Sequence, residues 1–162
     1  MGYLAVAVTT IMASVIESTW PVPLYWRGER PEVLVAAVLS AGAVFGARWG
    51  LTAGFFAALL RGALEHQPLG GLFIGYMAVG WAAGTVGYRL LVRRAVSAVP
   101  AAAICVVLFR FLVLICQPPA SFVLWLAGTF FAAIYTMLAA IPIHALALWM
   151  FGLGQRAWAP WR

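Results

Sequence analysis

The sequence predicts an all-α integral membrane protein, folded as a compact bundle of about six transmembrane helices with both termini in the cytoplasm. Of its 162 residues, 65% are hydrophobic and 9% are charged, whereas soluble domains have roughly 45–50% apolar and about 25% charged residues. A soluble domain of this length would expose much of its apolar surface to water. We therefore expect a single transmembrane domain covering residues 1–162.

Hydrophobic stretches separated by Pro, Gly and charged residues define the expected spans. A bilayer core about 30 Å thick requires roughly 20 apolar residues per helix. The expected spans cover residues 3–19, 32–47, 51–64, 69–91, 98–116 and 122–141, with a tight turn at 48–50. Because proline removes a helix hydrogen bond, Pro142 is expected to kink the last helix or to separate it from an interfacial tail over 142–153.

The arginines indicate the orientation, since cytoplasmic loops are enriched in positive charge. With six spans, one face of the membrane has three arginines, namely Arg27, Arg30 and Arg61. The other face has six, and is therefore predicted to be cytoplasmic: Arg48, Arg89, Arg93, Arg94, Arg156 and Arg162. Arginines placed between hydrophobic spans are typical of membrane topology signals, so we expect no binding of nucleic acid.

The polar residues do not form a recognisable catalytic or metal-binding set. Asp is absent, and the sequence has four Glu and two His. His66 and His144 fall on opposite faces of the membrane in the expected topology, whereas a zinc site needs three or four converging ligands. We therefore expect no enzyme activity, no metal and no cofactor.

Glycines recur at intervals of four residues in the second, third and fourth expected spans. Small residues at this spacing allow helix backbones to approach closely in a membrane. The residues predicted to pack in this way are Gly46, Gly50, Gly54, Gly71, Gly75, Gly80 and Gly84. Packing within the chain is the simpler interpretation, and contact with another subunit is the alternative.

Arg110 lies inside the fifth expected span, where an unpaired charge is costly. By depth in the membrane, its best partner is Glu17 and its second is Glu65. One interpretation is a structural ion pair, or a side chain that extends to the outer interface. The other is a polar group that lines an outward cavity or a surface for a partner protein.

Two further polar features each have two interpretations. His144 could titrate near neutral pH, but a hydrogen bond to a backbone carbonyl freed at Pro142 is the simpler explanation. The cytoplasmic loop with Arg89, Arg93 and Arg94 could bind anionic lipid or an acidic partner. The simpler explanation is that these arginines keep the loop on the cytoplasmic side of the membrane.

One central block of the sequence resembles the MreD family of bacterial rod-shape proteins. The block consists of Arg30-Pro31, then Gly50-x-x-x-Gly54-Phe55, then Leu69-Gly70 after a short loop. The length and the pattern of spans are also similar. Family members often have an acidic residue where this chain has Gly62, and a glycine where it has Ala58.

The resemblance implies a non-enzymatic scaffold in the bacterial inner membrane. MreD proteins bind the bitopic protein MreC, and work with the MreB filament, a RodA-type glycosyltransferase and a penicillin-binding transpeptidase in peptidoglycan synthesis. The fold is also similar to the substrate-binding S-component of energy-coupling-factor vitamin transporters. In that alternative, Glu17, Arg110 and residues 25–32 would line an outward pocket, although such pockets need several converging polar groups.

Overall fold

The computed structural model describes residues 2–21, 25, 28–87 and 97–150. Its elements in chain order are α1 (Gly2–Ser18), α2 (Val33–Phe45), α3 (Ala47–Glu65), α4 (Leu69–Ala82), the π-helix η2 (Ala83–Gly87), α6 (Ala98–Cys116) and α7 (Phe122–Met150). Regular structure in these residues is helical throughout, so the predicted all-α class is confirmed.

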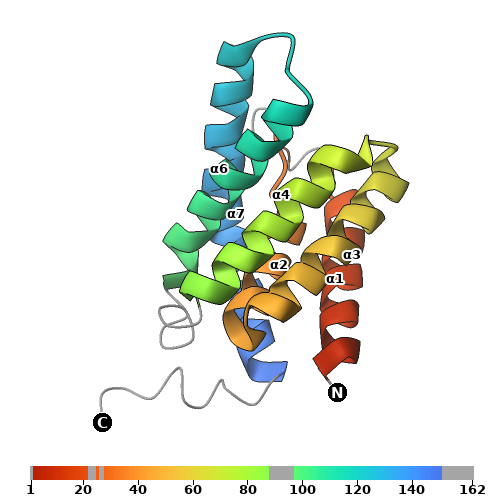
Figure 1. Ribbon diagram of the computed structural model, residues 1–162. Coiled ribbons are helices and arrows are strands. Elements are labelled where there is room, and N and C mark those ends of the chain that lie inside the picture. The colour runs from red at the N-terminus through yellow and green to blue at the C-terminus, as the bar shows by residue number, and fades with distance from the viewer. Residues whose placement is uncertain (1, 22–24, 26–27, 88–96, 151–162) are drawn as a thin grey trace.

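Helix α2 forms the centre of the bundle (Figure 1). It contacts α1, α3, α4, η2, α6 and α7, and every residue from Val33 to Val44 is buried. A helix that is apolar on all sides is stable only when other apolar groups surround it. The hairpin of α3 and α4 packs on one side of α2, and α6 pairs with α7. The start of α1 and the end of α7 lie at the same end of the bundle.

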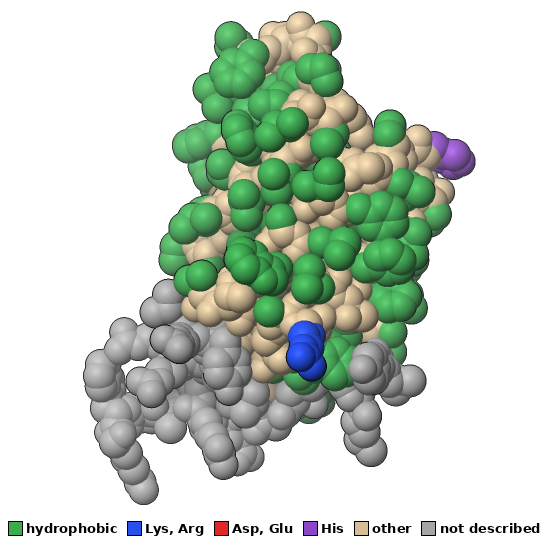
Figure 2. Space-filling model, viewed as in Figure 1, with side chains coloured by type: hydrophobic (Ala, Val, Ile, Leu, Met, Phe, Trp, Pro, Cys, Tyr) green, Lys and Arg blue, Asp and Glu red, His purple; other side chains and the backbone are tan. Residues whose placement is uncertain are grey.

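Within the described residues, three helical segments are long and apolar enough to cross a membrane, namely Leu69–Val86, Ala98–Cys116 and Phe122–Trp149. Val6–Ser18 and Val33–Phe45 are shorter apolar helices. Hydrophobic side chains cover one face of the bundle along its height (Figure 2). Exposed apolar surface of this extent is typical of a membrane or protein contact, which agrees with a membrane protein.

The tight turn expected at residues 48–50 was wrong. α2 ends at Phe45 and α3 begins at Ala47, with Gly46 alone between them. Gly46 has φ +91° and ψ 177°, a conformation essentially restricted to glycine. Because one residue redirects the chain, residues 48–50 belong to α3, which is longer than the expected span 51–64. A Cβ on Gly46 would meet open space, whereas a Cβ on Gly84 would lie 2.5 Å from the backbone of Gly46. Gly46 therefore lies at a close helix contact, but glycine is required there by the backbone conformation.

The last helix also differs from the expectation. α7 continues through Pro142 to Met150, so a separate tail beginning at Pro142 was wrong for the described residues. Pro142 is exposed, whereas His144 and Leu148, which follow it, are fully buried. Packing of this last part against the bundle therefore outweighs the hydrogen bond that Pro142 removes. The fourth expected span corresponds to α4 and η2 as far as Gly87, and its residues 88–91 lie outside the described part.

The other six glycines predicted to pack lie at helix–helix contacts within the chain. Gly50 and Gly80 touch backbone to backbone, and Gly84 meets the backbone of Ala47. A Cβ added to Gly54 would lie 2.5 Å from the carbonyl oxygen of Tyr76. Gly71 and Gly75 face Cys116 and Phe109 of α6. The backbone contacts of Gly50, Gly54, Gly80 and Gly84 leave no room for a side chain, so glycine sets the distance between those helices.

Candidate functional site: a buried charge network

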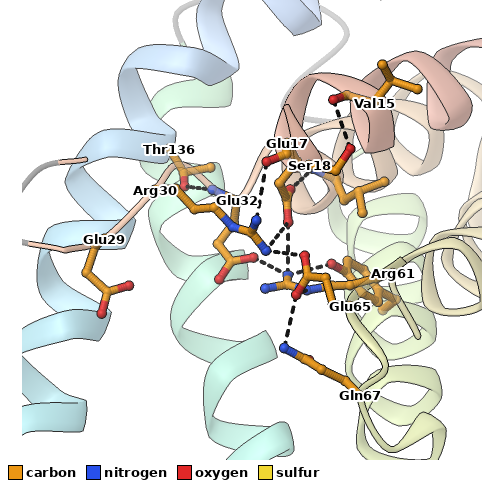
Figure 3. A network of polar contacts seen from close by, with 12 residues as sticks. Val15, Glu17, Ser18, Glu29, Arg30, Glu32, Arg61, Glu65, Gln67 and Thr136 are labelled. Atoms are coloured by element: carbon orange, nitrogen blue, oxygen red, sulfur yellow. Dashed lines mark hydrogen bonds and ion pairs between the residues drawn. The ribbon is translucent and has the colours of Figure 1, made fainter. Parts of the chain in front are cut away.

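All four glutamates of the sequence and three of its arginines form one network at the N-terminal end of α2. Figure 3 shows the part of it around Arg30 and Arg61. They come from three helices and from the connection before α2: Glu17 of α1; Glu29, Arg30 and Glu32 of the connection; Arg61 and Glu65 of α3; Arg110 of α6. Residues far apart in the sequence therefore meet in one place inside the bundle.

Arg61 is the centre of the network, and its side chain is only 9% exposed. Its Nη1 lies 3.2 Å from Glu17 Oε1, and it donates hydrogen bonds to the carboxylate of Glu32 and, at 2.8 Å, to the hydroxyl of Tyr76. Its Nε donates to Glu65 Oε2 at 3.3 Å. A buried guanidinium is tolerated only when its charge and its donors are satisfied in this way.

Glu32 connects Arg61 to Arg110. Arg110 Nη2 lies 3.1 Å from Glu32 Oε1 and 2.7 Å from Glu29 Oε2, and Arg110 Nε donates to Glu32 Oε1 at 3.2 Å. The backbone N–H of Glu32 donates to Thr136 Oγ1 of α7 at 2.9 Å. Through this one residue, α6 and α7 are joined to the start of α2.

Arg30 closes the network on the side of α1. It forms an ion pair with Glu65, and its Nη1 donates to the backbone carbonyl of Glu17 at 3.3 Å. Burial lowers the pKa of Arg30, but attraction to the carboxylates of Glu65 and Glu17 outweighs burial, so the pKa lies above its usual value. Arg30 therefore remains a cation at any physiological pH.

The length of α2 explains why charges are accommodated here. Its 13 residues extend about 20 Å at ~1.5 Å per residue, whereas the hydrocarbon core of a bilayer is about 30 Å thick. Beyond the N-terminus of α2, the interior of the bundle contains Pro31 and Glu32, both buried. The network therefore occupies the part of the interior that the short central helix does not reach.

The structure brings three of the predicted site residues together and separates the rest. Glu17, Glu65 and Arg110 belong to the network, but the expected pairing of Arg110 with Glu17 was wrong. Arg110 contacts Glu29 and Glu32, because Glu32 at the bundle centre lies between it and Arg61. The carboxylate of Glu17 faces Arg61 instead.

The remaining candidates lie elsewhere or outside the described residues. His144 is buried between α7 and α2, with Nδ1 3.1 Å from Ser40 Oγ. The predicted basic loop of Arg89, Arg93 and Arg94 lies outside the described residues. His66 ends α3 in a left-handed conformation and is exposed.

Sequence reasoning overlooked Arg61 and Glu32, the two most connected members. Arg61 was counted as a charge of the outer face, although it falls inside the expected span 51–64 and precedes Glu65 by four residues, a spacing that places both on one helix face. Glu32 was assigned no partner. The signal was a set of glutamates and arginines that all lie near the same predicted membrane face.

The network is satisfied largely by its own members. Each arginine contacts at least two glutamates, an arrangement that holds helices together. A cavity of about 480 Å³ lies elsewhere, between α2, α4, η2 and α6, and its lining is nearly all apolar: Leu39, Ala82, Ala83, Val86, Ser97, Pro100, Ala101, Ile104, Cys105 and Leu108. In the described residues, the network therefore links the helices by ion pairs. The cavity of about 480 Å³ does not reach it.

The chain matched no protein-family model, and comparisons with curated proteins and solved structures found no significant match. Its function is therefore inferred from the network, from the helices that the network joins, and from the central block of the sequence.

Proposed function

We propose that this chain is a non-catalytic scaffold of the MreD type in the bacterial inner membrane, with six spans and both termini in the cytoplasm. It binds MreC and helps to position and regulate lateral peptidoglycan synthesis. Through MreC it acts with MreB, a RodA-type glycosyltransferase and a penicillin-binding transpeptidase. Membrane lipids surround its apolar faces.

The observation that supports this proposal is that the residues resembling MreD belong to one structural unit. Arg30 forms an ion pair with Glu65 at the end of α3. Gly50 and Gly54 bring the backbone of α3 against α4, and Leu69 begins α4. The central block thus forms a close-packed hairpin and the ion pair that attaches it to the connection before α2.

A rigid bundle suits a protein whose task is to present a surface to partners. Ion pairs join α1, α3, α6 and the connection, and a hydrogen bond adds α7. Docking of a preorganised surface loses less conformational entropy than docking of a flexible one. Exposed apolar residues such as Phe55, Ile74 and Trp81 on the hairpin suit lateral contact with a transmembrane helix.

The vitamin-carrier alternative receives less support from the network. Glu17 and Arg110 were the residues expected to line a polar pocket, and both are in contact with groups of opposite charge from this chain. A ligand would have to displace those partners. The arginines of the network are held by its glutamates, and the cavity of about 480 Å³ described above is lined almost entirely by apolar residues.

Affinity purification of the tagged chain from its native membranes in mild detergent, followed by mass spectrometry, tests the proposal. We expect MreC and the elongation synthases to co-purify with the wild type. Gly50→Leu, which forces α3 away from α4, should reduce recovery of MreC, whereas Gly70→Ala, where a Cβ meets open space, should not. Recovery of two ATPases with a membrane coupler would identify a vitamin carrier. Absence of MreC from the folded wild type would refute the scaffold.

A further inference from the structure

The charge network contains more potential negative charge than positive charge. Four carboxyl groups meet three guanidinium groups. With all seven groups ionised, the network has a net charge of 3 − 4 = −1. An uncompensated charge away from water is costly enough that a group usually neutralises instead. One carboxyl group is therefore a candidate to retain its proton.

The contacts distinguish Glu17 from the other three carboxyl groups. Its side chain is 1% exposed, and its Oε1 is buried without a hydrogen bond. Arg61 Nη1 is 3.2 Å away, but the two protons of that nitrogen are directed to Glu32 and Tyr76. Arg30 Nη2 is farther from Oε1, at 4.0 Å. Glu17 is thus the carboxyl group of the network that accepts no hydrogen bond from an arginine side chain.

We propose that Glu17 is a proton-binding site, and that the folded protein holds this side chain as a neutral carboxylic acid within the network. The charges of the remaining three glutamates and three arginines then cancel. Glu17 Oε2 accepts the backbone N–H of Leu34 at 2.8 Å, which leaves Oε1 as the oxygen that carries the proton. This inference stands independently of the identity of the partner protein.

The surroundings of Glu17 determine how the site responds to pH. The connection contributes Arg30 and Glu32, α3 contributes Arg61 and Glu65, and α4 contributes Tyr76, whose hydroxyl is held by Arg61. Helix α2 packs against α1 and has no titratable side chain. Loss of the proton to solvent would make Glu17 the fourth anion of the network.

Glu17 lies one residue before the end of α1, where its side chain and its carbonyl attach α1 to α2 and to the connection. Ionisation places the extra charge at this attachment. A rise in pH is therefore expected to weaken the docking of α1, and a fall in pH to strengthen it. The site would make the fit of the first helix sensitive to proton concentration.

Infrared spectroscopy of the purified full-length protein in lipid nanodiscs tests the site directly. We expect a protonated-carboxyl band at neutral pH in the wild type, its loss at high pH, and its absence in Glu17→Gln. A wild type without the band at neutral pH would overturn the proposal. A band that persists unchanged in Glu17→Gln would place the proton elsewhere and would overturn it as well.

Thermal unfolding in detergent supplies a second readout with a matched control. Gln is a neutral isostere of the protonated acid, so Glu17→Gln should melt within about 3 °C of the wild type at neutral pH. Glu32→Gln, in the same network but between two arginines, should melt about 10 °C lower, because it removes a buried paired charge. Equal losses for both variants would show that Glu17 is needed as an anion, and would overturn the proposal.

The pH dependence of unfolding follows from the same linkage. An unfolded chain ionises a glutamate near pH ~4.3, so above that pH the folded state binds more protons than the unfolded state. Stability then falls as pH rises. The melting temperature of the wild type should decline toward alkaline pH, and Glu17→Gln should decline less. Identical profiles for the two proteins would contradict a proton on Glu17.

Discussion

Arg61 shows how a buried guanidinium can be a stabilising residue in this bundle. Its charge faces Glu17, Glu32 and Glu65, and its planar group lies over the ring of Phe109, 5.5 Å from the centroid. Removal of one partner from a buried ion pair is strongly destabilising, because the other charges lose their compensation. Arg61 is therefore the residue whose loss should disturb the network most.

Replacement of Arg61 with methionine tests this expectation. Methionine keeps the apolar stem and removes the charge, so the carboxylates of Glu32 and Glu65 lose their shared cation. We expect Arg61→Met to lower the free energy of unfolding by about 3–5 kcal/mol, measured by thermal or denaturant unfolding in detergent. Arg48→Met is the matched control on the same helix, because Arg48 is exposed, and it should change stability by less than about 0.5 kcal/mol. Similar effects of the two changes would contradict a central role for Arg61.

At this scale, the sequence identified several of the charged residues that form the network. It did not identify which of them pair with each other. Arg110, Glu17 and Glu65 were recognisable because charges are rare in apolar segments. Their pairing could not be predicted, because the depth of a residue in the membrane does not show which neighbouring helix its side chain faces. Glu32 lies in the bundle centre only because α2 is short and central, and neither property follows from the local sequence.

At the scale of elements, the hairpin of α3 and α4 depends on glycines whose Cα atoms touch the opposite backbone. Gly50 meets Gly80, and Gly54 meets Tyr76. The four-residue spacing predicted close packing, and it could not show that α4 is the neighbour. The break before α3 was predicted at residues 48–50 and lies at Gly46, because Gly46 belongs to the same periodic series and, in the sequence, resembles the packing glycines.

The hairpin contact is tested by the addition of one methyl group. Gly50→Ala places a Cβ against the backbone of Gly80, which cannot move without separating the helices. We expect a loss of about 1–3 kcal/mol in unfolding free energy. Gly70→Ala is the control, because its Cβ meets open space at the start of the adjacent helix, and stability should stay within about 1 kcal/mol. A neutral Gly50→Ala would show that the two backbones are farther apart.

Gly46 is tested by the same substitution for a different physical reason. A Cβ at this position has space, but φ +91° with ψ 177° is unfavourable for any residue with a side chain. Gly46→Ala should therefore cost about 1–3 kcal/mol through backbone strain alone, measured as above. If alanine is tolerated without loss, the break between α2 and α3 does not require this conformation.

At the scale of the whole molecule, hydropathy alone predicted an all-helical membrane protein, since the interval between polar segments matches the thickness of a bilayer. Three segments of the structure meet the length and apolarity that a crossing requires. Helix α3 was harder to assign, because it combines 19 residues with Arg48, Arg61 and Glu65. Its inward charges are compatible with lipid only because partners from other helices cover them.

The proposed topology places the two ends of α3 on opposite sides of the membrane. Arg48 near its start and His66 just after its end are both exposed, so each can be replaced by cysteine in a chain with Cys105 and Cys116 changed to alanine. A membrane-impermeant maleimide added outside intact spheroplasts should label His66→Cys and not Arg48→Cys. Disruption of the membrane should make both reactive. The opposite pattern would invert the proposed orientation.

The charge network also has a consequence for how the protein is made. α1 arrives in the membrane with Glu17, α3 with Arg61 and Glu65, and α6 with Arg110. Inserted alone, each of these charges in an apolar helix has a cost that its later partners remove. Glu17 of α1 therefore has no arginine of α3 beside it until Arg61 has been synthesised. Glu29 and Glu32 in particular lack Arg110 until α6 emerges, so a chain that stops before α6 has two glutamates without the cation that joins them.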